Sequence, residues 1–276
     1  MKLHRIILAV LLTLFLNGPA VAGPLEDGVA AYQRGDYAIA LGLWRPLAAQ
    51  GNAAAQHNLG VMYANGQGVP QNAAEAVKWY RLAAAQGNAA AQVNLGLMYD
   101  NGQGVPQSDA EAMKWYRLAA AQGNVAAQAN LGMMYANGQG VPRNDAEAVK
   151  WYRLAAAQGV ADAQANLGFM YDNGRGVPQN DAEAMKWYWL AAARGHAGAQ
   201  VILGLMYANG QGVAQNYATA HMWFNLAAAK GAPDGVKFRE IVAGKMTPQQ
   251  IAEAQKLAAE WKPKTWDQVK HLVPKQ

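Results

Sequence analysis

The side chains that carry nucleophilic or metal-binding chemistry are few in this sequence of 276 residues, and they are not spaced for catalysis. There is no Cys, and Ser108 is the only Ser, outside any Gly-x-Ser-x-Gly or Ser-x-x-Lys pattern. After residue 22 the His residues are His57, His196, His221 and His271, none in a His-Glu-x-x-His pattern. We therefore predict no catalytic residue and no metal ligand, and we expect these imidazoles at the surface or in packing positions.

Two loop patterns resemble ligand sites but are incomplete. Gly102-Gln103-Gly104 has the spacing that begins a dinucleotide fingerprint, although no third Gly follows and no strand precedes it. Asp100 to Glu111 spans the twelve residues of a calcium loop, but its third and fifth positions are Gly, so two ligands are missing. Because Gly-x-Gly recurs along the chain, turn geometry explains it, and we predict no cofactor.

Basic residues recur with acidic residues beside them. The basic residues are Lys78, Lys114, Lys150, Lys186, Arg81, Arg117 and Arg153, and Glu75, Glu111, Glu147 and Glu183 each precede a Lys by three positions. Since charges three apart on a helix pair with each other, we favour a solvated face over a track for an anionic polymer. Residues 23–231 hold 13 Lys and Arg against 13 Asp and Glu. This neutral body predicts no nucleic-acid partner.

The first 22 residues have the features of a secretory signal. Lys2 and Arg5 precede an apolar run over 6–16, and after the break at 17–19 the small residues Ala20 and Ala22 occupy the two positions that a signal peptidase reads. We expect cleavage after Ala22 and a periplasmic or secreted protein. Eleven apolar residues are too few to span a bilayer, and no later segment approaches the necessary length, so we expect no stable membrane insertion after cleavage.

A period of 36 residues organises the chain from residue 52 to residue 231. The recurring residues are Gly60, Gly96, Gly132, Gly168 and Gly204; Tyr63, Tyr99, Tyr135, Tyr171 and Tyr207; and Trp79, Trp115, Trp151, Trp187 and Trp223. They define five repeats, which are 52–87, 88–123, 124–159, 160–195 and 196–231. No repeat can bury both faces of its elements alone, so the repeats must stack.

Each repeat is expected to form two helices. In the second repeat, apolar residues at helical spacing predict a first helix, helix A, over 89–101, ended by Gly102. Ser108 and Glu111 predict a capping box at the start of the second, helix B. Helix B is expected to bury Ala112, Trp115, Tyr116, Ala119 and Ala120. Because Gly inside a helix is unfavourable, Gly96 predicts a close helix crossing with Tyr and Trp rings beside it.

The repeated run resembles the Sel-one-like repeat family, a branch of the tetratricopeptide-like helical repeats. The resemblance is carried by Leu95-Gly96-Leu97-Met98-Tyr99, Gly102-Gln103-Gly104-Val105-Pro106 and Lys114-Trp115-Tyr116, and by their counterparts over 52–231. It implies an all-α fold, a right-handed α-solenoid of antiparallel helix pairs that binds other proteins.

The segments on either side of the repeats are expected to close the array. Residues 23–51 resemble a tetratricopeptide hairpin and are interpreted as an N-terminal cap. Residues 232–276 are interpreted as C-terminal capping helices that end in a basic tail from residue 263. Thr247 to Gln250 has the pattern of a helix start with a capping box. The apolar stripe expected on that helix is Ile251, Ala254, Leu257, Ala258 and Trp261.

Helix A commonly lines the concave side of stacked helix pairs, so its outer positions are candidates for partner binding. The recurring Asn amides suit a peptide backbone, although ties between repeats explain their recurrence equally well. Three residues after the recurring Asn position, each repeat has an apolar residue whose type varies from repeat to repeat. This variation suggests tuning to a ligand, and core packing explains it at least as well. Near the end of helix A, Asp100 and Asp172 replace the Ala of the other repeats, in alternate repeats. The candidates are Asn58, Asn94, Asn130 and Asn166; Val61, Leu97, Met133, Phe169 and Leu205; and Asp100 and Asp172.

The leading hypothesis is an exported scaffold that binds a partner protein or peptide in the bacterial cell envelope, without catalysis. One alternative is an envelope hydrolase or penicillin-interacting enzyme. Exported relatives associated with that activity are rich in Cys, which this chain lacks, and it also lacks a nucleophile and paired catalytic carboxylates. A second alternative is a module that binds peptidoglycan or polysaccharide, for which the aromatic content is the only indication.

Overall fold

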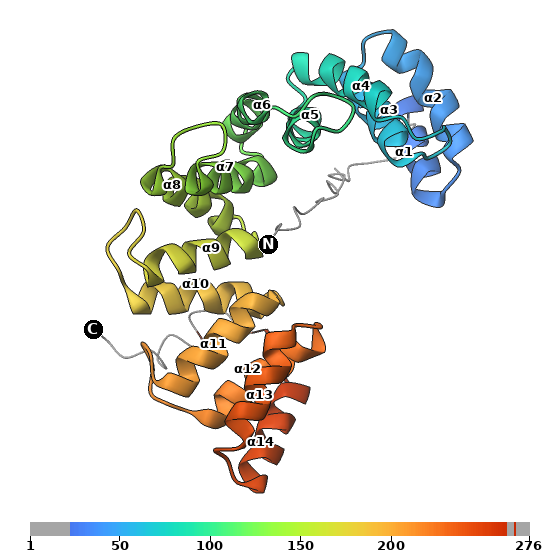
Figure 1. Ribbon diagram of the computed structural model, residues 1–276. Helices are drawn as coiled ribbons and strands as arrows, with labels where there is room; N and C mark the ends of the chain where they lie inside the picture. The colour runs from blue at the N-terminus through green and yellow to red at the C-terminus, as the bar shows by residue number, and fades with distance from the viewer. Residues whose placement is uncertain (1–22, 264–267, 269–276) are drawn as a thin grey trace. The chain divides into compact units, whose positions relative to one another are not determined.

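The computed structural model describes residues 23–263 and residue 268. The predicted signal peptide and most of the predicted basic tail lie outside the described residues. The described part forms helices and no strand, which confirms the all-α class (Figure 1). The helices are α1 (Pro24–Arg34), α2 (Tyr37–Ala49), α3 (Ala53–Asn65), α4 (Ala73–Ala85), α5 (Ala89–Asn101), α6 (Asp109–Ala121), α7 (Val125–Asn137), α8 (Asp145–Ala157), α9 (Ala161–Asp172), α10 (Asp181–Ala193), α11 (Ala197–Asn209), α12 (Tyr217–Ala229), α13 (Pro233–Ala243) and α14 (Pro248–Ala259).

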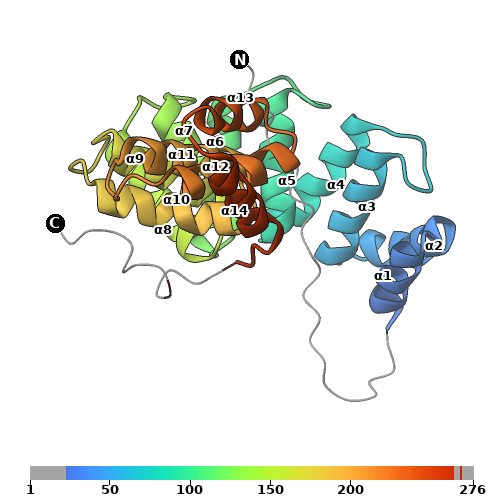
Figure 2. The ribbon, with the colours of Figure 1, turned by 90° about the horizontal axis from the view of Figure 1, so that it is seen from below.

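The chain divides into two compact units, whose boundary falls near the end of α7. The N-terminal unit contains α1 to α6, α7 as far as Met134, and residues 139–142. The C-terminal unit contains residues 135–138 and α8 to α14. Within each unit, consecutive helices form antiparallel pairs, such as α5 with α6 and α9 with α10, and each pair packs on the next (Figure 2).

Helix B begins as predicted, but its Glu does not complete a capping box. Ser108 Oγ accepts a hydrogen bond from the Glu111 amide at 3.3 Å, as an N-cap should. The Ser108 amide, however, donates to the Tyr99 carbonyl at 2.9 Å, at the end of the preceding helix A. Since that donor is already satisfied, the Glu111 carboxylate pairs with Lys114 instead, at 3.4 Å. The predicted box is therefore wrong here, whereas Thr247 and Gln250 form the predicted one at α14.

The predicted close crossing at the recurring glycine is present. A Cβ at Gly96 would lie 2.6 Å from the Tyr116 ring, and one at Gly168 would lie 2.8 Å from the Tyr188 ring. The ring of helix B therefore sits against the bare backbone of helix A. Trp115 departs from the prediction, because it is only half-buried, and the fully buried neighbour is Met113. Trp115 packs against the cluster of the first and second repeats, which contains Val77 and Leu95.

The Gly-x-Gly loop joins neighbouring repeats. Gly102 ends α5 with φ +66°, in the left-handed region, and its amide donates to Met98 O. Gly104 has φ +69°, and a Cβ there would lie 2.7 Å from the Ala74 amide nitrogen and closer still to the Ala73 carbonyl. Ala73 begins α4, so the loop of the second repeat rests directly on helix B of the first. A side chain at position 104 has no space.

A buried glutamine in each helix A links it to the preceding helix, a feature that our sequence analysis missed. Gln92 is 4% exposed, and its Nε2 donates to the Ala84 carbonyl of α4 at 3.1 Å. Its Oε1 accepts from Gln122 Nε2 at 2.8 Å. The same bond to a preceding carbonyl, at 3.0 to 3.5 Å, is made by Gln56, Gln128, Gln164 and Gln200. Each amide is a second donor to a carbonyl near the end of a helix, which also accepts from a backbone amide three residues on, as Ala84 O does from Gly87 N at 3.0 Å.

We expect Gln92→Leu to lower the free energy of unfolding by about 2 kcal/mol, because it removes both hydrogen bonds of a buried amide, one to the Ala84 carbonyl and one from Gln122. Leu has a similar volume, so the loss reports the hydrogen bonds rather than a cavity. Urea denaturation measures it. Gln103→Leu is the control, since Gln103 is exposed, and it should stay within about 0.5 kcal/mol of wild type. Equal midpoints for the two variants would contradict the interpretation.

The end of the described chain closes over the fifth repeat. α13 packs on α12 and α11, and α14 packs on α12. The Trp261 ring lies 4.7 Å from the Trp223 ring and 6.3 Å from the Trp189 ring, both edge-on. Ala254 of the predicted stripe is buried, whereas Leu257 is 41% exposed and lies outside the packed face. Aromatic edge contacts therefore anchor the segment after α14.

Candidate functional site

Two of the three predicted Asn candidates in the N-terminal unit, Asn58 and Asn94, take part in contacts between repeats, and the third, Asn130, is half-buried. Asn94 Nδ2 lies 3.1 Å from His57 Nε2, and His57 Nδ1 lies 3.3 Å from Asn58 Oδ1. His57 and Asn58 belong to α3 and Asn94 to α5, so the imidazole bridges two successive helix A elements. At this step, the recurring Asn has the structural role that we considered as one of its two interpretations.

We expect the stability of the N-terminal unit to fall as the pH drops below about 6.5, because burial lowers the pKa of His57 from that value. The unfolded chain then binds a proton before the folded protein does, so the stabilisation present above pH 6.5 declines toward the folded-state pKa. Urea unfolding near neutral pH and near pH 5 measures the difference. His57→Gln cannot titrate and should show a smaller difference; an unchanged difference would remove His57 as its source.

The apolar residue whose type varies among the repeats, at position 61 and its four equivalents, is half-buried in four of the five repeats. Val61 packs against the Leu95 cluster, and Leu205 packs against the cluster around Trp223. Leu97 and Met133 are also half-buried. Phe169, in contrast, leaves 42% of its surface exposed. The ring of Phe169 is therefore the member of this set that is most available to another molecule.

The two Asp candidates differ from what a groove contact requires. Asp100 is 2% exposed, so its carboxylate faces the protein interior rather than solvent. Asp172 is half-buried, and its Oδ1 accepts a hydrogen bond from Gln211 Nε2 at 3.0 Å. Burial, and then the charge of Asp181, raise the pKa of Asp172. Gln211 belongs to the next Gly-x-Gly loop, so Asp172 ties the fourth repeat to the fifth.

A small pocket of about 100 Å³ in the C-terminal unit brings two predicted residues together. Asn166 and Phe169 lie three residues apart on α9, both exposed, and both line it. The other lining residues are Ala136, Asn137, Tyr152, Met170 and Arg175. The pocket therefore presents an amide, an aromatic ring and a guanidinium side by side.

Our sequence analysis missed Arg175, although its departure from the repeat pattern could have identified it. It stands where the other loops have Gln, at positions 67, 103, 139 and 211. Its Nη2 and Nε donate to the two Asp145 oxygens at 2.8 and 3.1 Å, and Nη2 also reaches the Ala136 carbonyl at 3.3 Å. Its guanidinium lies 5.5 Å from the centre of the Phe169 ring. A bidentate pair of this kind fixes the guanidinium plane beside the ring.

Asp145 accepts hydrogen bonds from Arg143 as well, at 2.8 and 3.1 Å. The Arg175 and Arg143 guanidinium groups hold the pKa of the Asp145 carboxyl well below its usual range. The carboxylate therefore remains charged in mild acid and keeps Arg175 in place. Arg175 positions the Phe169 ring, and its charge is already compensated by Asp145.

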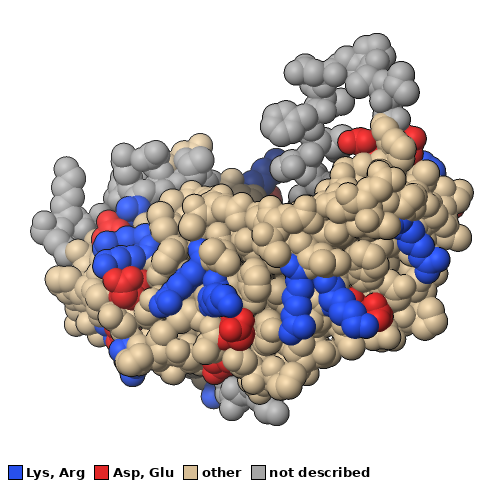
Figure 3. All heavy atoms as spheres, turned by 90° about the horizontal axis from the view of Figure 1, so that it is seen from above, with Lys and Arg blue, Asp and Glu red and all other residues tan. Residues whose placement is uncertain are grey.

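The basic rows on helix B form ion pairs and ties between repeats. The Lys–Glu pairs predicted at a spacing of three are present, as at Lys186 and Glu183, 3.3 Å apart. Arg81 Nη2 donates to Tyr99 Oη at 2.7 Å, across to the next helix A, and Arg153 makes the same bond to Tyr171 at 2.6 Å. Figure 3 shows basic side chains standing apart on one face, with acidic side chains beside several of them. This pattern agrees with the predicted solvated face.

The part of the chain that the structure describes holds no group of three His, Asp or Glu side chains placed to share a metal ion. His196 caps α11, where its Nδ1 accepts from the Ala199 amide at 2.9 Å. Across residues 23–263, none of the helices combines the length and the apolarity needed to span a bilayer.

Comparison with known proteins identifies the repeat. The Sel1 repeat family model matches residues 53–88, 89–124, 125–160, 161–196 and 197–231. The chain is similar to a solved Sel1 repeat protein from Oxalobacter formigenes, at 33% identity and a TM-score of 0.76, covering 88% of this chain and 99% of that one. No curated protein matches the chain.

Two further solved structures resemble the chain. One is a protective antigen present in uropathogenic Escherichia coli strains that displays an SLR fold, at 38% identity and a TM-score of 0.77. The match covers 86% of this chain and 53% of that one, so the chain spans about half the antigen's length. The other is the immunity protein PA5088 from Pseudomonas aeruginosa, at 19% identity and a TM-score of 0.51, covering 78% of this chain and 89% of that one. The last likeness concerns the fold alone.

Proposed function

The chain belongs to the Sel1 repeat family, and on that premise we propose that it is an exported, non-catalytic scaffold that binds a partner protein or peptide. Sel1 repeat proteins are generally protein-interaction scaffolds. The finer statements, which concern export, the surface used and the kind of partner, are the proposal.

The observation that carries the binding proposal is the exposed ring of Phe169. Among the described residues, Phe169 is the one aromatic side chain in the exposed class, and it lines a pocket with the Asn166 amide and the Arg175 guanidinium. Aromatic residues and Arg are enriched at the buried centres of protein interfaces. Here the Arg175 guanidinium, which Asp145 holds in place, lies 5.5 Å from the centre of the ring and favours this position of the ring before a partner binds.

The proposed site is narrower than the set of candidates from the sequence. Asn166 and Phe169 form its centre, because both are exposed at one pocket. Leu97, Met133 and Leu205 are counterparts of Phe169 with partly exposed surfaces, and they remain candidate contacts within their own units. Asn58, Asn94 and Asp100 are left out of the proposed centre because of their bonding or burial.

Capture of partners by the purified chain, residues 23–276, tests the binding surface. Extract from cells that express the protein supplies the partner, which mass spectrometry identifies and quantifies. We expect Phe169→Ala to reduce the yield of one stoichiometric partner at least about tenfold, the effect of removing an interface anchor. Leu154→Ala is the matched control, because Leu154 is 49% exposed but lies on helix B, and it should keep the partner. Equal losses from both variants would contradict the proposed surface.

Export rests on the basic, apolar and small-residue segments of the first 22 residues. Fractionation of expressing cells, followed by sequencing of the mature amino terminus, tests it. The expected result is a protein outside the cytoplasm that begins at Gly23. A cytoplasmic protein that retains Met1 to Ala22 would overturn the proposal of export. It would not affect the proposed binding surface, which the capture experiment tests separately.

A further inference from the structure

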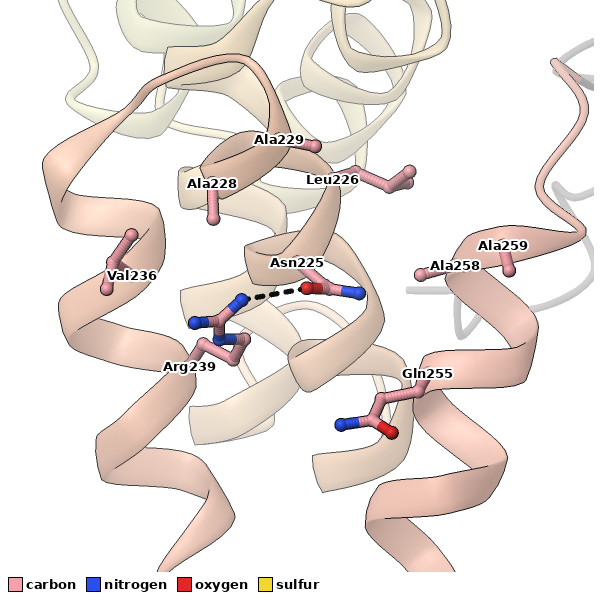
Figure 4. A pocket seen from close by; sticks show the side chains of 9 residues that line it. All are labelled: Asn225, Leu226, Ala228, Ala229, Val236, Arg239, Gln255, Ala258 and Ala259. Atoms are coloured by element: carbon pink, nitrogen blue, oxygen red, sulfur yellow. Dashed lines mark hydrogen bonds between the residues drawn. The ribbon is translucent and has the colours of Figure 1, made fainter.

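A cavity of about 470 Å³ lies in the C-terminal unit, away from the Phe169 pocket. Its floor is α12 and its two walls are α13 and α14, as the side chains drawn in Figure 4 show. The lining residues are Asn225, Leu226, Ala228, Ala229, Val236, Arg239, Gln255, Ala258 and Ala259. This volume is in the usual range for pockets that hold small molecules, roughly 300–1,000 Å³.

The polar part of the cavity holds a cation that has no acidic partner. Arg239 Nη1 donates to Asn225 Oδ1 at 2.9 Å, and no carboxylate within residues 23–263 pairs with it. A guanidinium has five N–H donors, so most of them remain to be used. The bond also fixes the Asn225 amide, leaving its Nδ2 group as a further donor in the cavity. Gln255 adds an amide from the opposite wall (Figure 4).

A second observation concerns the charge of Arg239. His221 precedes Asn225 by one helical turn on α12 and is 2% exposed. Its Nδ1 has no hydrogen-bond partner among the described residues. Burial, followed by the positive charge of Arg239, lowers the pKa of His221. Arg239 therefore acts on this helix as an uncompensated positive charge, the opposite of Arg175, which Asp145 neutralises.

The remainder of the cavity is apolar and shallow-walled. Leu226, Val236 and Ala258 come from its three helices, and the other apolar positions are Ala. Short side chains of this kind leave room for a branched group of a few carbon atoms. A charged head against Arg239 and an apolar body against these residues would satisfy both parts of the lining.

We propose that this cavity binds a small organic carboxylate, with its carboxyl group on Arg239 and its short apolar chain against Leu226, Val236 and Ala258. Carboxylates match the planar donor geometry of guanidinium. The chain's own residues 264–276 suit the site less, because they carry three Lys and one Asp. The inference concerns a site separate from the proposed partner surface and goes beyond that function.

The test is NMR of the arginine side-chain Nε–H groups in the chain of residues 23–276. The probe is isovalerate, and isovaleramide is its neutral counterpart of nearly the same shape. We expect isovalerate to shift the Arg239 resonance to saturation, whereas isovaleramide does not. Arg239→Gln should weaken isovalerate binding at least about tenfold, in line with the loss of a charged hydrogen bond. Arg194→Gln, in the same unit but not among the residues that line the cavity, should leave binding unchanged.

The comparison of acid with amide uses the unaltered chain, so it decides the question even where a variant folds poorly. No shift at Arg239, or equal binding of acid and amide, would overturn the proposal. So would full binding by folded Arg239→Gln. Neither probe requires a protein partner, so this result is independent of the capture experiment.

Discussion

The Gly96→Val variant is expected to lose about 3 kcal/mol or more of its free energy of unfolding. A Cβ at this position would lie 2.6 Å from the Tyr116 ring, and valine adds two further methyl groups at the same crossing. Both residues are buried, so neither helix can relieve the contact without separating from its partner. Overpacking of a tight core typically costs 1–3 kcal/mol and sometimes more, to which a β-branched residue in a helix adds a little.

Urea denaturation of the chain of residues 23–276 measures this loss. Gly42→Ala is the control for the helix interior, because no atom lies within 4 Å of the place that its methyl group would take on α2, and it should stabilise the protein by up to about 1 kcal/mol. In a Tyr116→Ala background, Gly96→Val should cost clearly less, since the ring that it meets is gone. A cost that is the same in both backgrounds would show that the ring is not the obstacle.

Replacement of Gly104 by Ala is the second large effect that we expect, again about 3 kcal/mol or more. Two penalties combine at this position. The left-handed φ of +69° disfavours any residue with a Cβ, by roughly 1–2 kcal/mol. In addition, the methyl group would meet the backbone of Ala73 and Ala74, which cannot rotate away as a side chain can. The loop would have to lift from the helix B on which it rests.

Gly87→Ala separates the two penalties. Gly87 also has a left-handed φ, +87°, but no atom lies within 4 Å of a Cβ built there. It should therefore show the conformational penalty alone, about 1–2 kcal/mol. Comparison of the unfolding midpoints of the two variants gives the contribution of contact between repeats. Equal losses would mean that the Gly-x-Gly loop serves only its own turn.

Local patterns predicted most of the secondary structure because each depends on neighbouring residues alone. The helix over 89–101 and its Gly102 end are confirmed, as is the Thr247–Gln250 capping box. The close crossing at Gly96 was also predictable, since a glycine retained inside every helix A requires a reason.

What the sequence did not reveal depends on contacts between repeats. Glu111 is a capping-box residue by spacing, but Tyr99 O had already satisfied the amide that it would have reached. Gln92 is a polar side chain, and its burial depends on a carbonyl of the preceding helix, eight residues back at Ala84. Both contacts compete with local interactions and are invisible to local rules.

The candidate site was predicted only in part, because contacts between repeats also decide which of its residues are exposed. Asn166 and Phe169 were identified by their places in the repeat, and they do lie at one pocket. Asn94 occupies the same position as Asn166 but contacts His57, which the first repeat alone supplies. Single departures from the repeat, such as Arg175 for Gln and His57 in place of Val or Ala, therefore determine which copies of a repeated position are free to bind.

Photo-crosslinking in intact cells at position 169 tests the central claim, that the chain acts by holding a partner protein on its helix A surface. p-Benzoyl-L-phenylalanine replaces Phe169 in one strain and Leu154 in another, and mass spectrometry identifies the adducts. Both positions are exposed, at 42% and 49%, so reactivity alone does not distinguish them. The account predicts one dominant protein adduct from position 169 and none of that adduct from position 154. The same adduct from both positions, or none from position 169, would contradict it.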